Sequence, residues 1–97
     1  MRMNLGNNVY TAWANQTQPR GQNYSRGTVY FQGPTIYSYG SHFPMAEKLD
    51  WGYLVNGDTR SPTTGQHQEG VRRVLREKDN ITIPFSALQS AGIDRRL

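Results

Sequence analysis

The segment from Arg60 to Lys78 most constrains the fold, because a helix start and an apolar stripe occur together in it. Ser61 is a favourable N-cap residue, and Pro62 suits the first helical position, where its missing N–H leaves no bond unmade. Three apolar residues recur at i, i+3 and i+4: Val71, Val74 and Leu75. This spacing predicts a helix with one buried face, and it places His67 on or beside that face.

Two segments rich in β-branched and aromatic residues, 28–32 and 35–39, flank Gly33 and Pro34. A tight turn between two such segments predicts a β-hairpin. Alternation predicts which side chains share a face: Val29 and Phe31 opposite Tyr30, and Tyr37 and Tyr39 opposite Ile36 and Ser38.

Shorter segments complete the predicted sheet. Strands are predicted at residues 9–14, 45–49, 51–55, 59–60 and 81–83, the last of them at an edge. The first has Val9, Thr11 and Trp13 on one face, although Ala-Trp-Ala also suits a helical turn. Asn56-Gly57-Asp58 predicts a hairpin turn between 51–55 and 59–60. Residues 86–91 suit a last helical turn, with Gly92 as its stop.

The order of these elements predicts an α+β fold: an antiparallel sheet of about four to five strands covered by one main helix. The 97 residues suffice for one small domain. Within it, residues 1–8 are expected to form a flexible lead-in, 15–27 a long loop and 93–97 a frayed tail. An exposed strand edge would permit a homodimer, but no sequence feature specifies one.

Composition limits the cellular compartment and the kinds of partner that are expected. The chain has no cysteine, which excludes disulfides, thiolate metal sites and a cysteine nucleophile. It has no apolar run long enough to span a membrane and no signal-peptide core, so a cytoplasmic protein is expected. The net charge of +4 is compatible with a polyanionic partner and equally with a solvated surface that carries spare arginines.

The start of the predicted helix is the first candidate site. Free N–H groups and the positive end of the helix dipole favour an anion there. Arg60, Ser61, Thr63 and Thr64 gather at this end, with His67 one turn beyond Thr63. The alternative is ordinary capping, with His67 packed or hydrogen-bonded.

Aromatic and basic residues extend the candidate site. Tyr37, Tyr39, His42 and Phe43 could offer stacking faces to bases beside Ser41, or the tyrosines could simply cover the sheet with Phe43 in the core. On the helix, Arg73 has acidic neighbours at Glu69 and Glu77, which favours Arg72 and Arg76 as polyanion contacts. The predicted ligand-binding residues are therefore Tyr37, Tyr39, Ser41, His42, Arg60, Ser61, Thr63, Thr64, His67, Arg72 and Arg76.

Catalysis has little support in the sequence. His42 and His67 are the only histidines, and no carboxylate stands at metal-ligand spacing from them. No serine-hydrolase elbow, Walker loop or dinucleotide-binding glycine motif occurs. We therefore assign no catalytic residue, no metal and no cofactor, and we keep a two-histidine phosphodiesterase or nuclease as a third hypothesis.

Several short blocks occur in a specific order: AWANQTQ at 12–18, YFQG at 30–33, IYSYGSHFPMA at 36–46, VNGD at 55–58 and SPTTGQH at 61–67. Together they resemble a family of small uncharacterised proteins found mainly in phages and other mobile elements. The resemblance covers residues 9–76. It implies a mobile-element origin and a bacterial host cytoplasm, and it carries no catalytic assignment.

The resulting hypothesis is a non-enzymatic accessory binding protein. Its ligand would bear phosphate, either nucleic acid or a nucleotide signal, and its role would be counter-defence. The alternative is a protein–protein inhibitor of a host defence effector, similar in mode to an anti-CRISPR factor.

Overall fold

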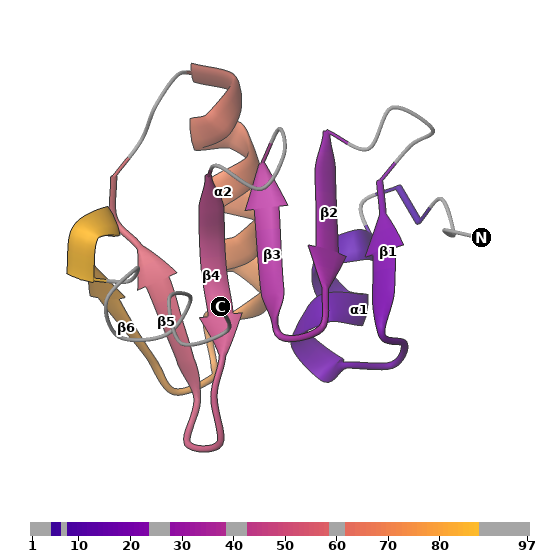
Figure 1. The fold of residues 1–97 in the computed structure, drawn as a ribbon, viewed down its shortest axis with the longest axis horizontal. Coiled ribbons are helices and arrows are strands. Elements are labelled where there is room, and N and C mark those ends of the chain that lie inside the picture. The colour runs from indigo at the N-terminus through magenta and orange to yellow at the C-terminus, as the bar shows by residue number, and fades with distance from the viewer. Residues whose placement is uncertain (1–4, 7, 24–27, 39–42, 59–61, 88–97) are drawn as a thin grey trace.

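Two helices pack against one face of a six-stranded sheet in the computed structural model, which describes residues 5–6, 8–23, 28–38, 43–58 and 62–87 (Figure 1). The strands lie in the order β1-β2-β3-β4-β5-β6. In chain order the elements are α1 (Asn8–Asn15), β1 (Arg20–Gln22), β2 (Val29–Gln32), β3 (Thr35–Ser38), β4 (Pro44–Lys48), β5 (Tyr53–Asn56), α2 (Pro62–Val74) and β6 (Asn80–Ile83). A helical turn follows at residues 85–87. The predicted α+β class is confirmed.

The hairpin predicted around Gly33 and Pro34 is confirmed as β2 and β3, which pair antiparallel. Gly33 has a φ of +60°, a left-handed conformation that glycine adopts without steric cost. Val29 and Phe31 are buried, whereas Tyr30 on the opposite face is half-buried. The pleat of the hairpin therefore follows the predicted alternation.

The last strand pairing differs from the prediction. β6 lies beside β5 and runs parallel to it, so the sheet is mixed and has six strands rather than four or five antiparallel ones. Parallel neighbours need a long crossover, and α2 is that crossover. Because β4 and β6 occupy both edges of β5, the predicted hairpin partner of β5 is wrong, and residues 59–60 themselves lie outside the described residues.

The predicted strand at 9–14 is wrong, because these residues form α1. Val9, Ala12 and Trp13 are buried together, at the i, i+3 and i+4 spacing of a helical face. The helical alternative for Ala-Trp-Ala therefore holds, and two helices rather than one main helix cover the sheet.

The predicted lead-in and loop contain ordered backbone pairing. The N–H groups of Leu5 and Gly6 donate to the carbonyls of Gln22 and Asn23, at 2.7 and 2.6 Å. Residues 20–22, inside the predicted loop 15–27, form edge strand β1. The predicted tail at 93–97 lies outside the described residues.

Helix α2 begins at Pro62, as predicted, and ends at Val74, before the predicted end at Lys78. Val71 and Leu75 are fully buried against the sheet. The main contributors to the core between the helices and the sheet are Val9, Trp13, Val29, Phe31, Ile36, Ala46, Tyr53, Val55, Val71 and Leu75. Among the described residues, no helix has the length and apolar character needed to cross a membrane.

Candidate functional site: a donor-lined groove between the two helices

The structure describes only part of the predicted site. Tyr37, His67, Arg72 and Arg76 lie in β3, α2 and the turn after α2. Five predicted residues lie outside the described residues: Tyr39, Ser41, His42, Arg60 and Ser61. The backbone of Thr63 and Thr64 belongs to α2, and their side chains are outside the description.

His67 joins the helix to the hairpin. Its Nδ1 lies 2.8 Å from the hydroxyl oxygen of Ser38, which is buried in β3. This contact joins α2 to the end of β3. Tyr37, however, points to the other face of the sheet, where it stacks on Tyr30 with ring centroids 5.0 Å apart. Tyr37 and His67 thus do not share one surface.

Burial lowers the pKa of His67 below its ordinary value. The unfolded chain then binds a proton more readily than the folded chain, so stability falls as the pH drops below about 6.5 toward the lowered pKa. We expect the urea midpoint to fall more between about pH 7 and pH 5 in the wild type than in His67→Gln. Equal pH dependence in the two proteins would contradict a buried, neutral His67.

A buried amide network anchors the same part of α2. Gln68 is 1% exposed, and its Nε2 donates to the carbonyls of Asn56 and Asp58 at 3.1 and 2.7 Å. Asn56 in turn donates from Nδ2 to the carbonyl of Pro44 at 2.9 Å. The ends of β3, β4 and β5 therefore meet α2 in space at these contacts. These hydrogen bonds have a structural role: they hold α2 against β4 and the end of β5, because buried polar groups need such partners.

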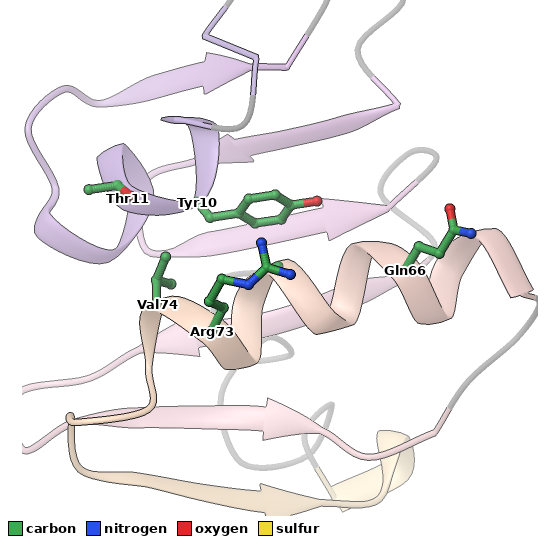
Figure 2. Close-up of a pocket in the computed structure, with 6 residues that line it drawn as sticks. Tyr10, Thr11, Gln66, Arg73 and Val74 are labelled. Carbon is green, nitrogen blue, oxygen red and sulfur yellow. The ribbon is translucent and has the colours of Figure 1, made fainter.

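A groove of about 220 Å³ lies between α1 and α2. Its lining residues are Tyr10, Thr11, Gln66, Gly70, Arg73 and Val74. Figure 2 shows the Tyr10 ring extending from α1 along α2, with its hydroxyl directed toward the Gln66 end and the Arg73 guanidinium rising toward the ring. We call this feature the interhelical groove.

Gly70 determines how closely Tyr10 approaches α2. Gly70 is buried inside the helix, and a Cβ added there would overlap the Tyr10 ring. Glycine in a helix interior costs about 1 kcal/mol relative to alanine, so close packing is the physical reason for tolerating it here. The wall of the interhelical groove is therefore the ring of Tyr10 resting on the backbone of α2.

The groove carries a positive charge and hydrogen-bond donors. Arg73 supplies a guanidinium, Gln66 an amide, and Thr11 and Tyr10 hydroxyls. Burial raises the pKa of Tyr10, an effect that the positive charge of Arg73 partly offsets, so the phenol remains protonated at neutral pH and can donate. None of the described lining residues is a carboxylate. These groups suit an anion.

The arginines of the helix differ from the sequence interpretation. Within the described residues, no ion pair joins Arg73 to Glu69 or Glu77, so the predicted neutralisation of Arg73 is not found there. Arg72, Arg73 and Arg76 are all exposed, as expected for a solvated helix face, but only Arg73 is among the described residues that line the groove. The arginine that the sequence analysis set aside is the one that faces the cavity.

Sequence reasoning missed Tyr10, Gln66, Gly70 and Arg73. One signal for them was present, since an isolated glycine inside a predicted helix marks a close approach by another element. The prediction of a strand at residues 9–14 hid this signal, because only a second helix brings Tyr10 to Gly70. The spacing of Gln66, Gly70 and Arg73, at i, i+4 and i+7, then marks the helix face that meets α1.

Comparisons with known proteins give no relative from which a function could be transferred. No protein-family model, no curated protein and no solved structure matches the chain. Within the part of the chain that the structure describes, no three His, Asp or Glu side chains gather as a metal site would require. The functional argument therefore depends on the groove and the residues around it.

Proposed function

We propose that the protein is a non-enzymatic binding module for a phosphate-bearing ligand, nucleic acid or nucleotide, and that the interhelical groove holds the phosphate. The single observation that carries this proposal is the position of Arg73, which faces a cavity whose other described lining residues include neutral donors and no carboxylate. A guanidinium presents a planar fork of N–H groups that matches two oxygens of one phosphate.

The charge distribution of α2 supports the proposal. Arg72 on α2 and Arg76 in the turn after it are both exposed near Arg73 in sequence. Clustered positive charge raises the local concentration of anionic ligands and speeds their association. In this proposal Arg73 contacts the ligand, and its neighbours attract it. The role in the cell would be that of a phage or mobile-element accessory protein acting against host defence in the bacterial cytoplasm.

The test is calorimetric titration of the protein with a mononucleotide and, separately, with a single-stranded oligonucleotide. Arg73→Ala should weaken whichever ligand binds by about tenfold, because hydrogen bonds to charged groups contribute about 1.5–3 kcal/mol. The matched control is Arg20→Ala, which removes the same charge from an exposed position on edge strand β1.

The outcomes separate cleanly. Binding that Arg73→Ala weakens and Arg20→Ala leaves unchanged supports the proposal. Absence of binding to both ligands, or equal weakening in the two variants, overturns it.

Two exposed apolar side chains favour protein–protein inhibition as the second candidate function. Trp51, beyond the end of β4, is 50% exposed, and Ile81 on β6 is 51% exposed. An apolar side chain on an edge strand is a typical element of a protein contact. If this function holds, a single host protein should co-purify in stoichiometric amount after nuclease treatment, and Ile81→Asp should abolish its recovery.

A further inference from the structure

We infer that the ligand of the interhelical groove is a small phosphomonoester of about the size of a 5′-mononucleotide, bound one molecule at a time, and not a nucleic acid chain. This inference rests on the proposed function and narrows it to one class of ligand. Three properties of the groove carry it: its volume, its single cationic side chain and the direction of its donors.

The volume limits the part of the ligand that the groove can enclose. The groove measures about 220 Å³, below the range of roughly 300–1,000 Å³ that is usual for sites of drug-sized ligands. α1 forms one wall and α2 the other (Figure 2). A phosphate and the sugar attached to it match this space. A base would extend from the open side, beyond exposed Gln66.

The charge of the lining fits one phosphate group. Among the described lining residues Arg73 is the one cation, because Arg72 and Arg76 lie outside the groove. Proteins that bind nucleic acid chains neutralise several phosphates, often 6–10, and their affinity depends on that number. One guanidinium instead suits a terminal phosphate, which carries up to two negative charges and three free oxygens.

Donors line the groove along its length. The Tyr10 hydroxyl points along α2 toward the Gln66 end, and the Arg73 guanidinium rises from the helix toward the Tyr10 ring (Figure 2). Arg73 can take two phosphate oxygens, while the phenol can donate to the third. The Gln66 amide both donates and accepts, so it suits the hydroxyls of a sugar. Val74 and the Tyr10 ring leave an apolar wall for the uncharged part of the ligand.

The experiment compares four probes on the full chain by calorimetry: adenosine 5′-monophosphate, ribose 5-phosphate, adenosine, and a single-stranded oligonucleotide without terminal phosphates. We expect one-to-one binding of the two phosphomonoesters and at least tenfold weaker binding of adenosine. Arg73→Ala should weaken the monophosphate at least tenfold. Tyr10→Phe, which keeps the ring over Gly70, should weaken it severalfold, and Arg72→Ala should have little effect.

One result overturns this inference alone. Tighter binding of the oligonucleotide than of the monophosphates, with a steep fall as salt increases and with loss in Arg72→Ala or Arg76→Ala, would show a nucleic acid chain on the outer face of α2. The proposed phosphate-binding function would then survive. If none of the four probes binds, the proposed function and this inference are both overturned.

Discussion

Trp13→Ala is expected to lower the free energy of unfolding by about 3–5 kcal/mol, the usual cost of truncating a buried aromatic residue. Trp13 is fully buried and packs edge-to-face on Tyr53, with ring centroids 5.4 Å apart. Its indole N–H donates to the carbonyl of Pro34 at 2.8 Å, in the turn between β2 and β3. The substitution therefore opens a cavity and removes one of two hydrogen bonds to the Pro34 carbonyl, which also accepts from the N–H of Lys48 at 2.8 Å.

The consequence for a domain of this size is large. Small domains are stable by about 5–15 kcal/mol, so the variant should be largely unfolded at moderate urea concentration. Trp13→Phe keeps an aromatic ring and loses the hydrogen bond, and it should cost less than Trp13→Ala. Far-UV circular dichroism in urea is the suitable measurement, since tryptophan fluorescence changes with the substitution itself.

The chain offers a matched control for Trp13→Ala. Trp51 is half-exposed, and Trp51→Ala should change stability by no more than about 0.5 kcal/mol, as most surface substitutions do. Equal effects at the two positions would mean that α1 does not pack on the sheet through Trp13, and the interhelical groove would lose its framework.

The sequence predicted best where local pattern and tertiary packing agree. The β2–β3 hairpin has alternating residues and a glycine turn, and both signals are local. Residues 9–14 satisfy two periods at once, because Val9 and Trp13 are consistent with alternation and also lie four positions apart, one turn of a helix. Burial of Ala12 beside them decides for the helix, and that burial depends on the sheet below.

The parallel pairing of β6 with β5 was not predicted from the sequence, for a different reason. Asn56, Gly57 and Asp58 have the composition of a hairpin turn, yet Asn56 is fully buried, and its side-chain oxygen accepts from the N–H of Asp58 at 2.9 Å. Gly57 instead donates to the carbonyl of Ile83 at 2.8 Å. A local turn signal cannot distinguish a hairpin from a strand end that pairs with a segment more than twenty residues away, because the competing contact is non-local.

The interhelical groove was not predicted for the same reason, because its residues come together only through non-local contacts. The residues predicted for anion binding cluster along the sequence at 60–67, whereas the groove takes Tyr10 and Thr11 from α1 and the rest from α2. His67 was predicted to bind the ligand, and the structure places it in contact with Ser38, between α2 and the β2–β3 hairpin. Its neighbour Gln68 drew no attention in the sequence, because an amide in a helix is usually exposed.

The effect of Gly70→Ala on the free energy of unfolding should change sign with the residue at position 10. Alanine is favoured over glycine inside a helix by about 1 kcal/mol, so an unhindered site would be stabilised. Because the new Cβ would overlap the Tyr10 ring, overpacking should cost about 1–3 kcal/mol and make the substitution neutral to destabilising in the wild type. In a Tyr10→Ala background the obstacle is gone, and Gly70→Ala should stabilise by up to about 1 kcal/mol.

A double-mutant cycle on urea unfolding measures this coupling, which should be about 1–3 kcal/mol. The ligand titration provides a second, independent measurement. Gly70→Ala displaces the Tyr10 ring from its place against α2, so binding of a monophosphate should weaken even though the arginine is intact. Equal stabilisation by Gly70→Ala in both backgrounds would show that Tyr10 does not lie over Gly70. If Gly70→Ala weakens ligand binding but the double-mutant cycle shows no coupling in stability, the ligand contacts α2 alone and not the wall that α1 supplies.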